Sequence, residues 1–329
     1  MKRYLSYSDY LQKKYGYRIY RVGVDADFSC PNRRGKCKEG GCVYCDSQGA
    51  TASYLRTNES SFSHKSLFEE EIDLLVNPHN IKNIKDQIER GRNFLMRRYK
   101  AEHFALYFQS FSNTFAPVSK LKQIYDSALE GNTWDGLIIS TRPDCIDEEK
   151  LKLIASYKQR GLDVAIELGL QSGDNDILKA MNRGHDVQCF IDAANLVKKY
   201  DIELCVHVLL GFPGEGKAQL DKTIAVINSV HPNAIKIHNL NITANTKLFD
   251  LYMEGKANAP CAKRHIQRTI YLLRRIPSDI VIERLICETP SHRLASPRLF
   301  PDKNNYLMRL ENEMDIQNVY QGDIHCSVL

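Results

Sequence analysis

The chain has 329 residues, of which 43% are hydrophobic and 26% are charged, and its formal net charge is +5. These values are ordinary for a globular protein with a full buried core, and the mild positive charge permits an acidic partner such as RNA without requiring one. The N-terminus lacks the apolar segment of a secretory signal, and no apolar run is long enough to span a bilayer, so neither secretion nor a membrane span is expected.

Ten cysteines are distributed along the chain. In a protein of this size without a secretory signal, they are not expected to form a disulfide framework, and a reducing, cytoplasmic location is predicted. Cysteines clustered in one loop of such a protein indicate metal ligands or catalytic groups. Others, such as Cys189 and Cys205, fall in helix or strand patterns and are expected to be small core residues.

Residues 1–21 combine six tyrosines with six basic residues ahead of the first expected strand. Alternating aromatic rings and positive charges suit base stacking and phosphate contacts on RNA. The same mixture is common on charged protein surfaces, so both interpretations stay open. A second basic segment, 90–100, carries Arg90, Arg92, Arg97, Arg98 and Lys100.

Short apolar segments predict strands at 22–26, 104–108, 136–140, 164–168, 204–210, 234–237 and 280–285. They are rich in branched and aromatic residues, which is typical of strands buried on both faces. Amphipathic segments of helical length separate most of them, and this alternation predicts a parallel sheet with right-handed crossovers. A doubly wound sheet and a barrel both fit, and in both the loops at the carboxyl ends of the strands carry the chemistry.

The segment 30–45 reads CPNRRGKCKEGGCVYC and directly follows the first expected strand. Its proline and glycines predict a loop. Closely spaced thiolates hold iron–sulfur clusters, and three ligands on a four-iron cluster would leave one iron open. A closed four-cysteine zinc site is the alternative, but zinc ribbons usually carry two CxxC pairs, and here only Cys42 and Cys45 form one.

This loop, with Tyr44 just before its last cysteine, resembles that of the radical S-adenosylmethionine (radical SAM) superfamily. The segments TRPD (141–144), ELGLQS (167–172), NRGH (182–185) and HVLLGFPGE (207–215) resemble the catalytic subunit of Elongator, a tRNA-modifying enzyme. The full set of motifs is similar to that of the YhcC-like radical SAM proteins and covers almost the whole chain. These motifs stand at 30–33, 40–45, 108–114, 141–145, 167–172, 182–185, 211–215, 236–238 and 321–322.

The resemblance implies a partial (β/α)6 barrel of parallel strands over residues 22–277, with an N-terminal extension (1–21) and a C-terminal extension (278–329). It implies that Cys30, Cys42 and Cys45 hold a [4Fe–4S] cluster whose open iron chelates the amino and carboxylate groups of S-adenosylmethionine. An electron from a flavodoxin- or ferredoxin-type donor would cleave that cofactor to methionine and a 5′-deoxyadenosyl radical. Cys37 departs from the family pattern and is expected not to be a permanent ligand.

Contacts to S-adenosylmethionine are implied at the carboxyl ends of the strands. Gln109 and Ser110 would hold the methionine amine. Arg183, twelve residues after Gln171 as in the oxygen-independent coproporphyrinogen oxidases, would grip the carboxylate bidentately, and a surface salt bridge is its alternative. The whole expected set is Tyr44, Gln109, Ser110, Asp144, Glu167, Gln171, Arg183, His207 and Gly211.

Four members of this set need separate expectations. Asp144 would accept the ribose hydroxyls, because Asp147 is the better cap for the next helix. Glu167, inside an apolar strand, points either toward the cofactor or to a buried basic partner. His207 and Gly211 end a strand where glycine would let the backbone approach adenine, and a plain turn is the alternative.

Substrate contacts are expected from Lys236 and His238, which alternate with isoleucines on the sixth expected strand and therefore face the same way. Inside a barrel that face meets the substrate, whereas on a sheet edge it meets solvent. The segment 283–303 is expected either to close the open side of the barrel or to form a solvated tail.

Three functions stay open at this point. The first is a radical SAM enzyme that modifies RNA, with tRNA as the expected substrate. The second is a radical SAM enzyme that acts on a small metabolite or a protein side chain. The third is a zinc-stabilised binding module without catalysis.

Overall fold

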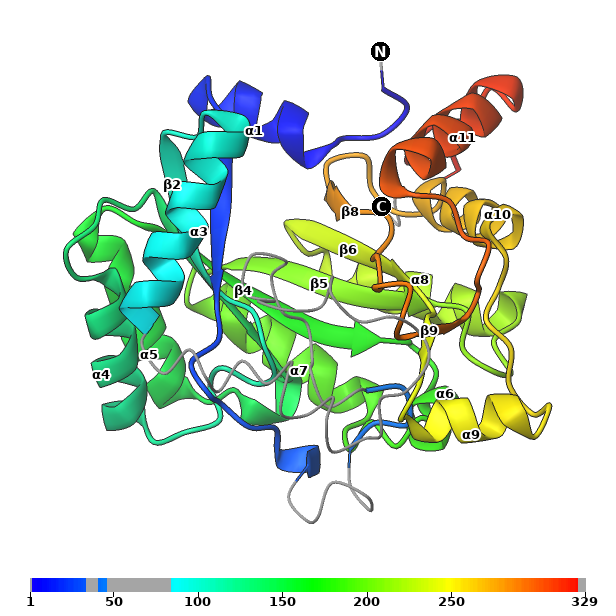
Figure 1. The fold of residues 1–329 in the computed structure, drawn as a ribbon, viewed down its shortest axis with the longest axis horizontal. Coiled ribbons are helices and arrows are strands. Elements are labelled where there is room, and N and C mark those ends of the chain that lie inside the picture. The colour runs from blue at the N-terminus through cyan, green and yellow to red at the C-terminus, as the bar shows by residue number, and fades with distance from the viewer. Residues whose placement is uncertain (1, 34–40, 46–83, 325–329) are drawn as a thin grey trace.

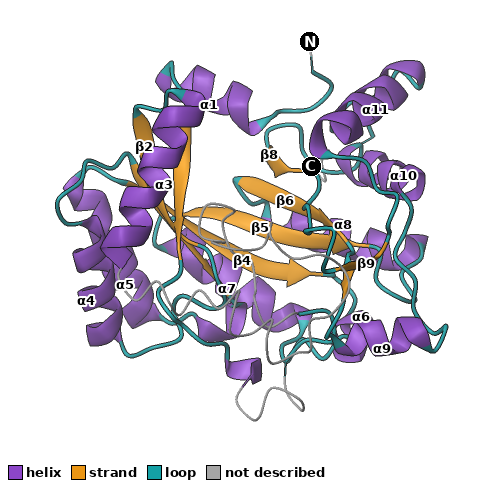
Figure 2. Cartoon of the chain, viewed as in Figure 1, coloured by secondary structure: helices purple, strands orange, loops and turns teal. Residues whose placement is uncertain are grey.

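The computed structural model describes residues 2–33, 41–45 and 84–324 (Figure 1). Seven parallel strands form one sheet in the order β1-β2-β3-β4-β5-β6-β8, and the sheet curls into a half-barrel (Figure 2). The predicted partial barrel is therefore confirmed, and its seventh strand corresponds to the segment predicted at 280–285, which lies outside the expected (β/α)6 region. The strands are β1 (Ile19–Val24), β2 (His103–Phe108), β3 (Gly136–Thr141), β4 (Asp163–Gln171), β5 (Glu203–Leu210), β6 (Ala234–Asn239) and β8 (Val281–Arg284).

Helices connect the strands and cover the outer face of the sheet (Figures 1 and 2). A separate pair of short antiparallel strands, β7 (Ile242–Thr243) and β9 (Leu294–Ser296), lies against α9 (Lys247–Met253). The connecting helices are α3 (Ile84–Tyr99), α4 (Val118–Leu129), α5 (Glu148–Ser156), α6 (Asn175–Ala180), α7 (Val187–Lys199), α8 (Lys217–Val230) and α10 (Ala262–Leu273).

The two faces of the sheet differ in chemistry because side chains alternate along each strand. The outer face is apolar: Leu106, Ile139, Ile166, Val206 and Ile235 are fully buried beneath the helices. Burying one such side chain contributes roughly 1.5–3 kcal/mol, so this face supplies the main core. The inner face carries charged and polar side chains at its centre, and the space it encloses is called the lumen below.

The N-terminal segment spans the gap between the edge strands β1 and β8. The Ile282 amide of β8 donates to the Leu5 carbonyl (2.8 Å), and Ser6 forms a parallel bridge with Ile282. Helix α1 (Tyr7–Tyr15) then crosses the amino end of the barrel, where Leu11 is buried. Three tyrosines of α1 also pack against residues of the inner face: Tyr7, Tyr10 and Tyr15. Much of the aromatic content considered for RNA contact therefore closes the barrel.

The sheet extends past both expected boundaries of the barrel region. β1 begins at Ile19, because Ile19 already pairs with His103 of β2, so the first strand starts three residues before the predicted 22–26. β8 lies beyond residue 277, and α11 (Lys303–Ile316) packs into the main core. The segment 283–303 begins in β8, and its Leu285 and Ile286 are buried in the main core, so its start is not a solvated tail. Closure of the barrel by this segment and the three-part division of the chain stay predictions.

The late QG motif has a structural role in this arrangement. The Gln321 side chain accepts from the Leu5 amide (3.0 Å) and donates to the carbonyls of Pro277 (2.7 Å) and Ile280 (2.8 Å). It therefore ties the N-terminal segment to the start of β8. Within the described ranges, the helices are too short or too polar to cross a bilayer.

Candidate functional site

The cysteine loop lies at the carboxyl end of the half-barrel. Cys30 follows β1 and is buried, as is Cys42, whereas Cys45 is partly exposed. Cys42 and Cys45 form a turn in which the Cys45 amide donates to the Cys42 carbonyl (3.0 Å). Cys37 lies outside the described residues. The three cysteines expected to bind a cluster thus stand on the loop that the sequence indicated.

The NRGH segment holds this loop in place. The Asn182 side chain donates to the Gly41 carbonyl (2.7 Å), and the Val43 amide donates to the Met181 carbonyl (3.0 Å). These two bonds anchor both sides of Cys42 to the chain that follows α6. The NRGH motif after β4 therefore positions Cys42, although Asn182 and Gly41 are 141 residues apart in the sequence.

Arg183, the next residue of that segment, reaches Cys42 itself. Its Nη1 atom lies 3.5 Å from the Cys42 sulfur, and the Asn32 side-chain amide lies at the same distance. Burial alone would raise the pKa of the Cys42 thiol, but the Arg183 charge and hydrogen bond outweigh it, and the pKa falls below its usual value. Thiolates are the form in which cysteines bind metals, so this environment suits a cluster ligand.

Gln171 and Arg183 meet over Gly169 of β4, as their spacing suggested. A Cβ atom at position 169 would lie 2.5 Å from Arg183 Nη2 and 2.5 Å from Gln171 Nε2. Arg183 Nη2 also donates to the Gly169 carbonyl (3.1 Å). Glycine is therefore required there to admit both side chains. Arg183 is buried, so the structure does not show the surface salt bridge that was its alternative interpretation.

Asp144 is paired with an arginine of its own motif. Its two oxygens accept from Nε and Nη2 of Arg142, both at 2.8 Å, and Nη2 also donates to the Arg183 carbonyl (2.8 Å). The carboxylate therefore orients Arg142, which sequence reasoning missed although it stands inside the TRPD motif, and the expected ribose contact of Asp144 stays a prediction. Asp147 caps α5 as predicted, accepting from the Lys150 amide.

Several buried polar atoms around the cysteines have no hydrogen-bond partner among the described residues. They are Tyr44 Oη, Arg142 Nη1, Arg183 Nε and His185 Nε2. Buried polar groups are normally satisfied, so such atoms call for a bound group. Burial and the nearby Arg183 charge lower the pKa of His185 to about 4, so its ring is neutral at neutral pH. The positive charges of this donor set are therefore the guanidinium groups of Arg142 and Arg183. This donor set fits an anionic group such as a thiolate-bound cluster with a carboxylate.

Three more of the expected site residues lie at strand ends. Ser110 is buried and Gln109 is partly exposed at the end of β2. Gly211 has a φ of 113°, and a Cβ there would lie 2.5 Å from Pro260 Cγ. Its amide donates to Glu215 (3.1 Å). Pro260 and Glu215 are therefore the immediate neighbours of Gly211, and the expected approach to adenine stays a prediction.

A buried charge network fills the middle of the lumen around Glu167. Its carboxylate accepts from Arg21 (2.9 Å), from the Tyr107 hydroxyl (2.7 Å) and from His207 Nε2 (2.8 Å). It also pairs with Lys236. Of the two expectations for Glu167, the structure shows the buried basic partners, and a contact of Glu167 with the cofactor stays a prediction.

Glu283 of β8 extends this network across the half-barrel. It pairs with Arg21 (2.6 Å) on the opposite edge strand and with Lys236 (3.6 Å). Lys236 is only 2% exposed, and its ammonium pairs with two carboxylates, while its expected substrate contact stays a prediction. Burial opposes ionisation of Glu167, but the charges of Lys236 and Arg21 hold its pKa well below the usual value.

His207 and His238 form the layer next to this network. Their ring centroids are 5.1 Å apart, and His238 Nε2 is buried without a partner among the described residues. Burial lowers the pKa of His207 despite its bond to Glu167, and burial with nearby His207 and Arg284 lowers that of His238 further. Both rings are therefore neutral at neutral pH. His207 lies within β5, and its hydrogen bond to Glu167 orients the ring, so it is not part of a plain turn.

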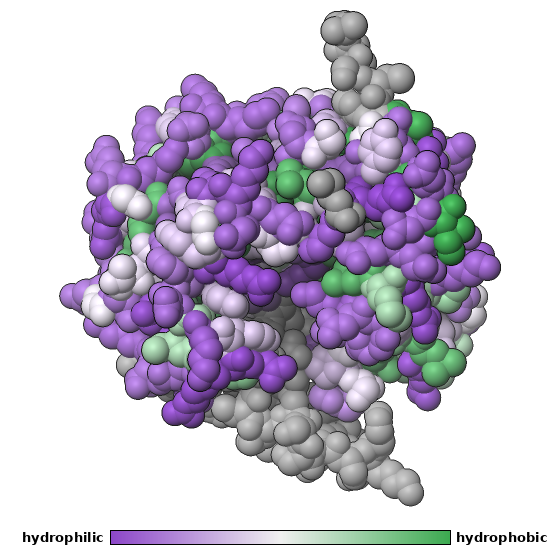
Figure 3. All heavy atoms as spheres, turned by 90° about the horizontal axis from the view of Figure 1, so that it is seen from above, coloured by the Kyte–Doolittle hydropathy of each residue, from purple (hydrophilic) through white to green (hydrophobic). Residues whose placement is uncertain are grey.

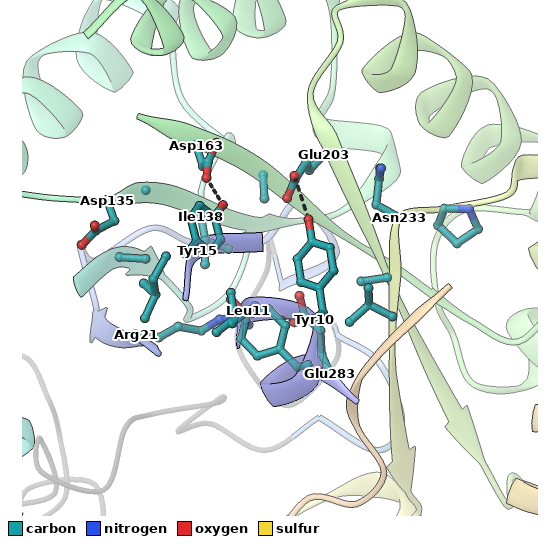
Figure 4. Close-up of a pocket in the computed structure, with 18 of the residues that line it drawn as sticks. Tyr10, Leu11, Tyr15, Arg21, Asp135, Ile138, Asp163, Glu203, Asn233 and Glu283 are labelled. Atoms are coloured by element: carbon teal, nitrogen blue, oxygen red, sulfur yellow. Dashed lines mark hydrogen bonds and ion pairs between the residues drawn. The ribbon is translucent and has the colours of Figure 1, made fainter. Parts of the chain in front are cut away.

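A cavity of about 330 Å³ lies at the other end of the barrel, between α1 and the amino ends of the strands (Figure 4). Its polar lining is internally paired, with Tyr10 bonded to Glu203 (3.4 Å) and Tyr15 to Asp163. Seen from this side, the surface is mainly hydrophilic, with small scattered apolar groups (Figure 3). The cysteines, Arg183 and the unpartnered donors are at the carboxyl end, so that end is the candidate site.

A parallel half-barrel with a cysteine loop after its first strand defines the class of this protein. Residues 35–227 match the radical SAM superfamily, and residues 232–315 match the radical SAM C-terminal domain. The chain therefore belongs to the radical SAM superfamily, which implies an enzyme and generally implies a [4Fe–4S] cluster and S-adenosylmethionine.

Two similar proteins match this chain over nearly its whole length, and a solved structure matches it over about three quarters. The chain is 32% identical to the uncharacterized protein MJ0486 of Methanocaldococcus jannaschii, over 97% of this chain and 91% of that one. It is 28% identical to protein YhcC of Escherichia coli K12, over 95% and 93%. Elp3 of Methanocaldococcus infernus has the same fold, with a TM-score of 0.63 and 20% identity over 74% of this chain and 61% of that one. The YhcC-like assignment is confirmed.

Proposed function

We propose that Cys30, Cys42 and Cys45 hold a [4Fe–4S] cluster on which S-adenosylmethionine is reductively cleaved. The observation that supports this most is the Arg183 contact to Cys42, in a pocket whose remaining guanidinium N–H groups have no partner among the described residues. When bound, the cluster would supply one electron for the reductive cleavage of the S–C5′ bond of S-adenosylmethionine, which gives methionine and a 5′-deoxyadenosyl radical. A flavodoxin- or ferredoxin-type protein supplies the electron.

The chain's own residues orient the cofactor. Arg183 and Gln171 bind the methionine carboxylate, while Gln109 and Ser110 bind its amine. Arg142, oriented by Asp144, adds a second positive charge beside the thiolates. The ring of Tyr44, which lies 5.2 Å from that of Phe212, shields the site from water.

Arg183→Lys is expected to weaken S-adenosylmethionine binding while leaving the iron content of the reconstituted protein unchanged. Lysine keeps the charge but loses the planar fork, and loss of a bidentate charged contact costs roughly 1.5–3 kcal/mol. Isothermal calorimetry on the reconstituted protein measures this, with Arg160→Lys, at an exposed pair with Asp126, as the matched control. Equal affinities for the parent and the Arg183 variant would place Arg183 outside the carboxylate site.

We infer that the substrate is RNA, with tRNA as the candidate. A tRNA uridine(34) acetyltransferase of Methanocaldococcus infernus is 27% identical over 47% of this chain and 29% of its own length. A probable threonylcarbamoyladenosine tRNA methylthiotransferase of Methanocaldococcus jannaschii is 36% identical over 26% and 20%. On this chain, the end of α3 exposes a basic and aromatic surface that suits phosphate and base contacts: Arg97, Arg98, Tyr99 and Lys100.

Loss of the gene is expected to change the nucleoside composition of tRNA. Mass spectrometry of digested tRNA should show one modified nucleoside missing, or a precursor accumulating, in a deletion strain. The parent gene should restore the pattern, whereas a Cys42→Ala gene should not. Identical nucleoside profiles in all strains would reject tRNA and favour the alternative, a small metabolite or a protein side chain as substrate.

A further inference from the structure

Strand β8 contains a bulge that turns two successive side chains toward the lumen. Ile235 pairs with Ile282, but the next residue, Lys236, pairs with Arg284, which leaves Glu283 as the extra residue. Bulges re-aim side chains and are frequent beside active sites. Glu283 contacts Arg21 and Lys236 in the lumen network.

Arg284 is directed to the same space, because it pairs in register with Lys236, whose ammonium lies in the lumen network, and paired residues of neighbouring strands point to the same face of a sheet. Its charge acts on the ionisation of Tyr107, His207 and His238, which all belong to the inner face of the sheet. The side chain is partly buried and contributes to the layer of the two histidines. The bulge therefore places Arg284 on the same face of the sheet as the two imidazoles.

The charges of this layer do not balance within the described part of the chain. Its carboxylates are Glu167 and Glu283, and both are ion-paired with Arg21 and Lys236. No carboxylate of the described residues pairs with Arg284, and the two histidines are neutral. One positive charge is therefore left over. A partly buried cation without a partner is costly, so this arrangement calls for an anion.

The neighbouring histidine supplies a second observation that points to a ligand. His238 Nε2 is buried without a partner, 5.1 Å separating its ring centroid from that of His207. A neutral imidazole can donate one hydrogen bond from this atom to an oxygen. A guanidinium fork with an adjacent imidazole donor is the geometry that recognises a carboxylate or a phosphate.

We propose that Arg284 and His238, with His207 beside them, bind an oxyanion of the substrate, a carboxylate or a phosphate, in the lumen. The substrate class is thus a molecule, or a nucleotide unit of RNA, that carries such a group near the reacting position. The inference rests on the proposed function only in assigning the lumen to the substrate. The carboxylate of S-adenosylmethionine is assigned to Arg183, so oxyanion and cofactor bind together.

Differential scanning calorimetry of the anaerobically reconstituted protein tests this with inorganic phosphate and acetate as probes. Each replaces chloride at constant ionic strength. An anion that binds only the folded state should raise Tm by roughly 1–2 °C, and the larger of the two increments identifies the phosphate or the carboxylate as the better ligand. The increment should persist when S-adenosylmethionine is saturating.

Variants assign the increment to Arg284. Arg284→Gln should abolish it, Arg284→Lys should keep part of it, and Arg309→Gln, at an exposed position on α11, should keep all of it. In chloride buffer, Arg284→Gln should be no less stable than the parent, because it removes an uncompensated charge. An increment that is absent in the parent, equal in Arg284→Gln, or abolished by S-adenosylmethionine would overturn the proposal.

A bromide soak of parent crystals gives a measurement that needs no variant. Anomalous scattering should place bromide beside Arg284 and His238, and a lumen without a bromide peak would count against the site. Neither measurement uses RNA or a reductant. Failure of oxyanion binding would therefore leave the proposed cleavage reaction standing, and failure of cleavage would leave the oxyanion site standing.

Discussion

Alanine in place of Cys30, Cys42 or Cys45 is expected to abolish both iron incorporation and cleavage of S-adenosylmethionine. Three thiolates are the minimum that holds a four-iron cluster with one iron open, so two cannot retain it. Iron and sulfide analysis after anaerobic reconstitution measures the first effect. Chromatographic detection of 5′-deoxyadenosine after addition of dithionite measures the second.

Two other cysteine variants serve as controls. Cys261→Ala changes an exposed cysteine outside the candidate site and should leave both measurements unchanged. Cys37→Ser should also retain the iron of one cluster per chain and cleave the cofactor at least as fast as the parent, because a fourth thiolate would close the open iron. Loss of iron in Cys37→Ser would make Cys37 a true ligand and favour the closed zinc-like site. Retention of cluster and cleavage in any alanine variant would refute the ligand assignment.

Glu167→Gln is expected to lower the free energy of unfolding by about 3–5 kcal/mol, because it leaves the buried charges of Arg21 and Lys236 with Glu283 as their one remaining carboxylate in the described lumen. Urea denaturation of the apoprotein measures this without interference from the cluster. The matched control is Glu203→Gln, which breaks the half-exposed pair with Lys14 at the barrel rim and should cost no more than about 1 kcal/mol. Equal losses in the two variants would contradict the structural role of the network.

The deficit of Glu167→Gln should depend on pH in a defined direction. Burial and Arg21 lower the pKa of Lys236, and Glu167 opposes them. Without Glu167, the folded-state pKa falls further below the unfolded-state value, so the unfolded state binds more protons and stability rises with pH. The deficit is therefore expected to shrink between neutral pH and the unfolded-state pKa of lysine, about 10.4. A deficit that stays constant over this range would argue that Lys236 does not titrate.

The sequence was informative about the fold because the outer face of every strand is apolar. Segments around Leu106, Ile166 and Val206 are buried against helices, and such runs predict parallel strands. The start of β1 was predicted too late because Ile19, Tyr20 and Arg21 look like part of the tyrosine-rich segment. Their strand conformation depends on pairing with β2, which is a long-range contact that local patterns do not contain.

Site residues could be predicted where a motif alone indicates the role. They could be predicted less well where the role of a side chain depends on which residues it contacts in the folded protein. The family resemblance implied the roles of the loop cysteines and of Gln171 with Arg183, and the structure brings Gln171 and Arg183 together. Asp144 and Glu167 were expected near the cofactor, but each has its carboxylate engaged by arginine. The bulge that turns Arg284 toward the lumen is set by the pairing of β6 with β8, and no local sequence signal specifies such a shift.

Electron paramagnetic resonance of the dithionite-reduced protein, with and without S-adenosylmethionine, tests the central claim most directly. The account predicts the signal of a reduced [4Fe–4S] cluster, a change in its g-values when the cofactor is added, and 5′-deoxyadenosine in the same sample. A protein that binds zinc in place of iron, or whose cluster signal does not respond to S-adenosylmethionine, would contradict it.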